Sequence, residues 1–439
     1  MIRFAAAFAA ALAAGVFLIA PTPRYKLVQL PGGIVYVTAE MLVESGTEVR
    51  GARSGTVLRM APGFNGRAVI VARGEAIRLH DFTIEGNRES YDRRAELPPY
   101  DVPFADFTRA NGVLALDVTG LTVQRVVIQN INGFALLIAR ARRVQVDRVQ
   151  ISNSGSRNAA GRNNTTGGIL FEEGAADFRV TNSTLRHIRG NGIWTHSLYT
   201  SPRNGPGVIA RNHIELVGRD AIQVGHAFDI QVLENAGREI GFPIEDVDME
   251  GRGIPVAIDT AGNVERTSYS HNRFEEINGK CFDLDGFHHG DVRANACVNR
   301  QPPDAYRFGG YGLVINNTNP DMQSEAIRIT DNLFDGPMFG GIFVIGAGHT
   351  VSRNRLLNVN IAHCNEEAAR FGCYYAAGEP DMLRSGIYLG KGAERPAPAQ
   401  NTLVADNEIT GYGMASRCIG IAPGVARSAN TIRNNRCRD

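Results

Sequence analysis

Three carboxylates in one part of the sequence have the types and spacing needed for acid–base chemistry. Asp259 lies in the segment Ala-Ile-Asp-Thr, and Asp283 and Asp285 lie in Cys-Phe-Asp-Leu-Asp. Two carboxyl groups about 5 Å apart suit a retaining glycoside hydrolase, and about 6.5–9.5 Å suits an inverting one. Crowded carboxylates also disfavour ionisation of both groups, which supplies a protonated acid. We expect Asp283 or Asp285 to protonate the leaving oxygen and Asp259 to activate water.

The same three residues permit two other functions. Carboxylate oxygens are ligands for Ca²⁺, so Asp259, Asp283 and Asp285 could hold a calcium ion that bridges to a uronate. A nearby base such as Lys280 would then remove the C5 proton, as a polysaccharide lyase or epimerase requires. The hydrolase needs no cofactor. The third possibility is a polar strand face on a protein that only binds glycan.

Other side chains are candidates for the same surface. His288 and His289 lie three and four residues after Asp285 and complete the catalytic set that we predict. Trp194 is the only tryptophan and suits a sugar-stacking platform, although an adjacent loop would cover it equally well. The predicted substrate-binding residues are Trp194, His196, Gln223, His226, Asn316, Tyr388 and Lys391.

A repeat along the chain predicts the elements that position these residues. An apolar residue, two others, Asn, one other and an apolar residue recur with Asn at 212, 235, 272, 295, 332, 354, 407 and 435. Several intervals are 22 or 23 residues, which indicates one structural repeat. Each repeat holds short runs of alternating apolar residues and is too short for a helix pair, so strands must coil.

Strand alternation gives the candidate residues a common direction. Ile222, Ile258 and Phe282 are expected to point inward, so the residues between them point outward. Asp259 and Asp283 then occupy one column on successive coils, about 5 Å apart, with Asp285 about 7 Å along the strand. Long insertions leave mainly from one edge of this strand. We expect them to wall a groove that suits an extended saccharide chain.

The repeat resembles that of the pectate-lyase-like right-handed parallel β-helix superfamily over roughly residues 50 to 437. The resemblance implies an all-β, single-stranded solenoid of about eleven coils of about 23 residues. An Asn ladder would occupy a tight bend, where Asn tolerates the left-handed conformation, and the outward strand would carry the active site. Polygalacturonase-like members show an Arg-Ile-Lys after their His-Gly. This chain has His289-Gly290 without it, so a galacturonate substrate is not implied.

The remaining features concern domains and compartment. An apolar run from residue 4 to 20 after Arg3 predicts a signal peptide or N-terminal anchor over residues 1–22, and 23–439 is expected to form one β-helix domain with a cap near 39–44. Six cysteines suit disulfides in a secreted or periplasmic protein. They are placed as Cys281 with Cys297, Cys364 with Cys373, and Cys418 with Cys437, but the sequence does not fix the pairing. The net charge of +1 argues against nucleic acid. We expect a polysaccharide or oligosaccharide partner and no integral membrane domain beyond the possible anchor.

Overall fold

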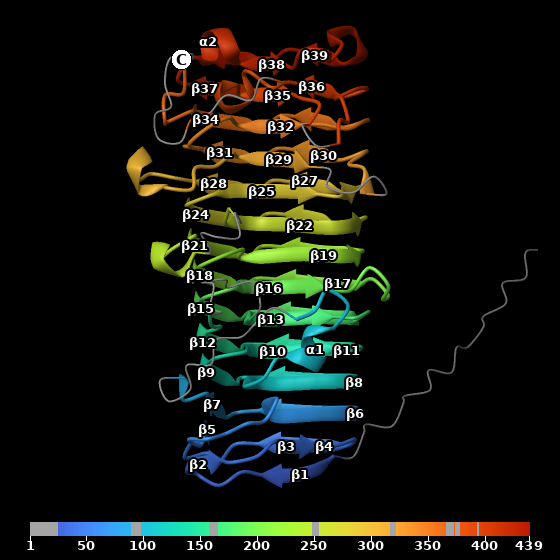
Figure 1. Cartoon of the computed structure of the whole chain (residues 1–439), viewed down its shortest axis with the longest axis vertical. Coiled ribbons are helices and arrows are strands. Elements are labelled where there is room, and N and C mark those ends of the chain that lie inside the picture. The colour runs from blue at the N-terminus through green and yellow to red at the C-terminus, as the bar shows by residue number, and fades with distance from the viewer. Residues whose placement is uncertain are drawn as a thin grey trace, which may run out of the picture.

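The chain winds into a solenoid whose strands stack in parallel from one end to the other (Figure 1). The computed structural model describes residues 25–88, 98–157, 166–247, 254–316, 322–365, 373, 378–392 and 395–439. The predicted signal peptide or anchor therefore lies outside the described residues. The strand content and the parallel pairing confirm the parallel β-helix.

Three stacks of strands form the three faces of the coil. The first, which we call the site face, contains β3 (Met41–Val43), β6 (Ala68–His80), β8 (Asn111–Gln124), β10 (Phe134–Ala139), β13 (Gly167–Glu172), β16 (Asn191–His196), β19 (Ile222–Phe228), β22 (Val256–Glu265), β25 (Lys280–Asp285), β29 (Leu313–Asn316), β32 (Ile342–Val344), β35 (Ile387–Leu389) and β38 (Ile419–Ile421). The second contains β1 (Lys26–Gln29), β4 (Thr47–Arg50), the later parts of β6 and β8, β11 (Arg142–Asp147), β14 (Ala176–Thr181), β17 (Gly207–Ala210), β20 (Ile230–Leu233), β23 (Ser268–Ser270), β27 (Asp291–Arg293), β30 (Arg328–Thr330), β33 (Thr350–Ser352), β36 (Leu403–Ala405) and β39 (Thr431–Arg433). Strand β26 (Phe287–His288) pairs with the end of β22.

The third face has more strands than the coil number that we expected. It contains β2 (Gly33–Val37), β5 (Thr56–Met60), β7 (Thr83–Glu85), β9 (Val127–Ile131), β12 (Gln150–Ser154), β15 (Thr184–Ile188), β18 (His213–Val217), β21 (Ala236–Ile240), β24 (Arg273–Ile277), β28 (Ala296–Val298), β31 (Leu333–Asp335), β34 (Arg355–Val359), β37 (Glu408–Gly411) and β40 (Arg436–Arg438). These 14 strands exceed the eleven coils that we expected, because coiling already begins before residue 50, where the repeat was traced from.

Helical turns are short and lie between strands. They are α1 (Phe104–Phe107), η2 (Ile244–Asp246), η3 (Pro303–Ala305), η5 (Met382–Arg384), α2 (Met414–Arg417) and η6 (Arg427–Ala429). In the part of the chain that the structure describes, no helix has the length and apolar character needed to span a membrane.

Inward-facing aliphatic and aromatic residues make one continuous core along the coil axis. Ile222, Ile258 and Phe282 are all buried in it, as alternation predicts. Residues 39–44, which we expected to cap the coil, instead contain β3, and Met41 pairs with Ile70 in the next coil. Disulfides join Cys281 to Cys297, Cys364 to Cys373 and Cys418 to Cys437, a pairing that the sequence left open.

The Asn ladder runs along the bend between the second and third faces. The Asn235 main-chain N–H and side-chain amide both donate to Oδ1 of Asn272, at 3.0 and 2.9 Å, and Asn272 donates to Asn295 in the same way. We expected the Asn itself to adopt the left-handed conformation. The residue before each ladder Asn adopts it instead. His271, for example, has φ 58°. That residue makes the bend, which leaves the Asn side chain free to point inward and bond.

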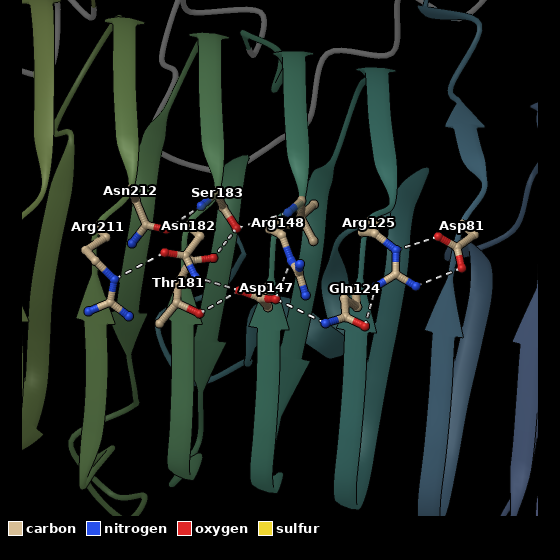
Figure 2. Close-up of polar contacts among 11 residues, drawn as sticks. Asp81, Gln124, Arg125, Asp147, Arg148, Thr181, Asn182, Ser183, Arg211 and Asn212 are labelled. Atoms are coloured by element: carbon tan, nitrogen blue, oxygen red, sulfur yellow. Dashed lines mark hydrogen bonds and ion pairs between the residues drawn. The ribbon is translucent and has the colours of Figure 1, made fainter.

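A second polar ladder lies outside the same bend in the coils that lack Asn (Figure 2). Arg125 donates to both carboxylate oxygens of Asp81, at 2.6 and 2.9 Å. Asp147 accepts from Gln124 and Asn182 of the neighbouring coils, at 3.1 and 2.8 Å. Although burial acts to raise it, these donors lower the pKa of Asp147 to about 2. Side-chain pairing between coils therefore continues where the inner ladder is absent.

Candidate functional site

The predicted carboxylates come together on the site face. Asp259 of β22 is in register with Asp283 of β25, because the inward residues Ile258 and Phe282 pair beside them. Neighbouring strands in a sheet are about 4.8 Å apart, so the two outward Asp side chains start from adjacent points. Asp259 is only 8% exposed, whereas Asp283 and Asp285 are half-buried.

A chain of buried amides holds Asp259. Asn191 Nδ2 donates to Gln223 Oε1 at 2.7 Å, and Gln223 Nε2 donates to Asp259 Oδ2. Asn191, Gln223 and Asp259 come from three consecutive coils of the site face. Gln223 therefore lies in the site as predicted, and it orients the carboxyl group instead of standing free for a ligand.

Asp283 has a different environment. Its carboxylate forms an ion pair with Lys280, and Asn316 Nδ2 donates to its Oδ1 at 2.8 Å. Asn316 therefore also belongs to the site. The two neighbouring carboxyl groups thus differ in their partners: a neutral amide beside Asp259, and a cation with an amide beside Asp283.

Burial and like charges raise the pKa of Asp259 well above its ordinary value. The largest cause is the loss of water around it, followed by the charges of Asp220 and Asp283. Burial also raises the pKa of Asp220 to about 6, although Arg219 opposes this. The neutral form of Asp259 is therefore favoured. Asp259 and Asp283 are not themselves in the lining of the pocket described next, and Asp259 lies behind Gln223, which is.

A pocket of 260 Å³ opens over this part of the face. Strands β16, β19, β22 and β25 form its floor, and its lining is Trp194, His196, Ser197, Tyr199, Arg219, Gln223, Gly225, His226, Ala261, Gly262 and Asp285. Four predicted substrate-binding residues, Trp194, His196, Gln223 and His226, and the predicted catalytic Asp285 are therefore in the lining. Burial lowers the pKa of His196 to about 4, so its ring is neutral at ordinary pH.

The segment around α1 covers the site face on the N-terminal side of this pocket. The Phe104 ring packs edge-on against Trp194 at 5.1 Å and against His196 at 5.4 Å. Glu172 anchors the segment by accepting the main-chain N–H groups of Phe104 and Ala105, at 3.0 and 2.6 Å. Trp194 is only 8% exposed as a result, so it is not the open stacking platform that we expected.

Two predicted binding residues lie outside the pocket. Tyr388 of β35 is buried and stacks on Phe343 at 6.0 Å. Lys391 donates from Nζ to the carbonyl oxygen of Pro423 at 3.0 Å. β35 follows β25 by three coils, about 14 Å at the spacing of neighbouring strands. The prediction that they join the substrate surface is therefore wrong for the described site. Tyr388 is buried in the core, and Lys391 bonds the main chain at Pro423.

The two predicted catalytic histidines are also not in the pocket lining. His288 pairs in register with Glu265 beyond the pocket, and its Nδ1 lies 3.3 Å from the carbonyl oxygen of Gly286. His289 is half-exposed and lies 3.4 Å from Glu325. Gly286 has φ 63° and turns the chain away between Asp285 and these histidines. This turn separates them from the carboxylates.

The three aspartates do not form a ready cation site. Among the described residues, the acidic and histidine group whose ligand atoms all lie within 4.8 Å is Glu172, Glu173 and His196. Glu172 and Glu173 already accept main-chain N–H groups there, the latter from Leu198 at 2.9 Å. Lys280 already neutralises Asp283, so calcium would have to displace that ion pair. The donors present therefore do not fit calcium without rearrangement.

Three site residues were not predicted from the sequence: Asp220, Arg219 and Tyr199. Asp220 lies two residues before Ile222, so strand alternation points both side chains inward. A carboxyl group at an inward position could have identified Asp220 as an unusual residue. Its Oδ1 accepts the main-chain N–H of Val256 at 3.1 Å. Burial and the charge of Asp285 raise the pKa of Tyr199. Tyr199 lies on an insertion outside the repeat, where periodicity gives no information.

Replacing Glu172 with glutamine should remove a pH dependence of stability. Burial raises the pKa of Glu172 to about 8 from 4.5. The stabilisation from its neutral form is complete below pH 4.5 and is lost as the pH rises through 8. Each pKa unit corresponds to about 1.4 kcal/mol. Glutamine does not ionise but keeps only one of the two acceptor oxygens, so Glu172→Gln should melt below the wild type at pH 5, and this deficit should shrink by pH 9.

Thermal unfolding followed by circular dichroism at pH 5, 7 and 9 tests this expectation. The quantity to compare is the difference in Tm between wild type and variant, because other titrating groups cancel in it. A difference that stays constant from pH 5 to pH 9 would show that Glu172 is ionised throughout.

Comparisons with known proteins give structural similarity only. No protein-family model matches the sequence, and no curated protein matches it. The Dettilon tailspike protein is similar with a TM-score of 0.55 at 11% identity, over 92% of this chain and 63% of that one. An exopolygalacturonase from Thermotoga maritima is similar with a TM-score of 0.51 at 10% identity, over 76% and 82%. DFA-IIIase from Arthrobacter chlorophenolicus A6 has a TM-score of 0.50 at 12% identity, over 93% and 87%.

Proposed function

The chain has the pectate-lyase-like parallel β-helix fold, and on that fold we propose that it is an exported glycoside hydrolase. The observation that carries the proposal is the register pairing of Asp259 with Asp283, with Asp285 lining a pocket beside them. Paired carboxyl groups in unlike environments are the arrangement by which glycosidases separate acid from base. The exopolygalacturonase among the similar structures is consistent with carbohydrate chemistry on this scaffold.

In this proposal Asp259 is the general acid and Asp285 the general base, which reverses the roles inferred from the sequence. The neutral Asp259 carboxyl donates its proton to the glycosidic oxygen as the bond to the anomeric carbon breaks. Water attacks that carbon from the other side, and Asp285 takes the water proton. A diagonal step of one coil and two residues spans about 8 Å, which lies in the range of inverting enzymes. We expect inversion at the anomeric carbon.

Asp283 has a supporting role in the same scheme. Its ion pair with Lys280 and its bond from Asn316 fix it beside Asp259. Its negative charge raises the pKa of Asp259, after burial and the charge of Asp220. Calcium-dependent elimination remains the second candidate because Lys280 is the amine beside these carboxylates. Against it, that amine is engaged with Asp283.

Three disulfides support the exported part of the proposal, since such bonds persist in oxidising compartments. A saccharide, not a nucleic acid, is the proposed partner.

Incubation of the purified protein with neutral and acidic polysaccharides, in calcium or EDTA, tests the function. Reducing ends and absorbance near 235 nm are read together. Reducing ends without unsaturation, equal in both buffers, are the expected result. Calcium-dependent unsaturation would replace the hydrolase with a lyase. No reducing ends and no rise in absorbance, together with binding to a glycan array, would indicate a binding protein.

A further inference from the structure

The outer surface of the site face is accessible over only a few coils. Leu137 and Leu170, which point outward on β10 and β13, are fully buried. Past the carboxylates, Val314 of β29, Phe343 of β32 and Tyr388 of β35 are buried too. The open groove that we expected along this face is therefore not present among the described residues. What remains is the pocket between the two covered regions.

The N-terminal side is closed by a packed apolar wall. Phe104 and Ala105 belong to a separate buried cluster with Leu137, Leu170 and Trp194. The Phe104 ring also packs edge-on against Phe134 at 5.7 Å. The wall is built of side-chain packing and the two hydrogen bonds to Glu172, so it belongs to the folded structure. A saccharide chain lying along the face would collide with it at β16.

The outward residues on the C-terminal side are buried as well. Val314, Phe343 and Tyr388 belong to the main buried cluster, which also includes Leu383 of η5. Asn316 and Lys280 occupy the space around Asp283 with polar contacts. The pocket of 260 Å³ lies below the 300 Å³ or so at which sites for drug-sized ligands begin. It therefore suits one sugar unit and not a run of several.

We propose that the pocket binds the end of a saccharide chain, so that the protein removes terminal sugar units and does not cut internal bonds. This inference rests on the proposed hydrolase function. The terminal unit enters the pocket with its linkage beside Asp285 and Gln223, the residue that bonds Asp259, and the rest of the chain leaves toward solvent. Arg219 and Asp285, one charge of each sign, are the basic and acidic side chains in the lining, and Lys280 pairs with Asp283 beside it. That balance favours an uncharged sugar unit over a uronate.

Two sets of substrates separate this inference from the function on which it rests. p-Nitrophenyl glycosides of single neutral sugars and of galacturonate and glucuronate report terminal cleavage. Dye-labelled cross-linked polysaccharides release dye only when internal bonds are cut. Release of p-nitrophenol from a neutral glycoside, with no dye above the blank, is the expected result. Dye release would overturn the inference but keep the hydrolase function. Cleavage confined to uronides would overturn the choice of a neutral sugar. No product from either set of substrates would overturn both proposals.

The Phe104→Ala variant tests the wall directly. Removing the ring opens the pocket toward β13, so dye release should rise from the blank while p-nitrophenol release persists. Tyr412→Ala, which removes an aromatic ring that is 40% exposed near the C-terminus, is the control and should leave both readouts unchanged. Phe104→Leu keeps apolar packing if the alanine variant fails to fold. A product pattern identical to wild type in a folded Phe104 variant would show that the wall does not set the mode of cleavage.

Discussion

Replacing Asp259 with asparagine is expected to lower kcat by about 10³-fold, because a general acid contributes 10²- to 10⁴-fold to such reactions. Asparagine has the same shape and can still accept the hydrogen bond from Gln223, but it has no acidic proton to give. Burial and the charges of Asp220 and Asp283 raise the pKa of Asp259. Wild-type activity should therefore fall only as the pH rises above that raised value. Initial rates on the best substrate of the panel, from pH 4 to pH 9, measure both effects.

Asp291→Asn is the matched control. Asp291 lies on β27, outside the pocket lining, where it forms an ion pair with Arg328 at 2.5 Å. Its loss should leave kcat within about twofold, because a surface ion pair contributes little even to stability. Equal rates for wild type and Asp259→Asn would remove Asp259 from the mechanism. A folded Asp259→Asn variant is expected, since the substitution removes a carboxyl group whose ionised form is disfavoured where it lies.

Replacing Asn272 with alanine should destabilise the protein by about 2–6 kcal/mol, since each of four hydrogen bonds contributes about 0.5–1.5 kcal/mol. The Asn272 side chain accepts from the Asn235 main-chain N–H and amide, and donates to the Val232 carbonyl and to Asn295. These groups are buried, so water cannot replace the missing partner. The midpoint of urea unfolding gives the change.

Asn435→Ala provides a control with the same number of side-chain bonds. Asn435 accepts two from Asn407 and donates to the carbonyl oxygens of Val404 and Arg433. It lies half-exposed in the last coil, where water can take over, so its loss should cost at most about 1 kcal/mol. If both variants unfold at the same urea concentration, burial does not explain the contribution of the ladder.

The sequence was sufficient to predict the coil, but not the segments that cover its site face. The spacing of the ladder Asn residues and the parity of Ile258 and Phe282 place Asp259 beside Asp283, because neighbouring coils must pair in register. The burial of Trp194 and Tyr388 could not be predicted from repeat spacing and strand alternation. It depends on segments outside the repeat, such as α1, whose packing no periodicity encodes.

Two further differences have local physical causes. The coil before residue 50 was not counted because its bend near Leu30 has no Asn. In later coils without Asn, such as those of Val126 and Val149, pairs such as Arg125 with Asp81 hold the bend from outside. His288 and His289 follow Asp285 closely in sequence. The turn at Gly286 nevertheless carries them away from the carboxylates, and sequence distance alone cannot show such a turn.

The hydrogen bonds of the Asn ladder all point one way, which has a consequence for how the solenoid is assembled. Asn212 donates to Asn235, Asn235 to Asn272, and so on to Asn435. A chain that is completed from its N-terminus would thus always present two free N–H groups at its newest Asn. The incoming coil supplies the oxygen that they lack. The growing end is therefore a directional template, and we expect each finished coil to select the register of the next.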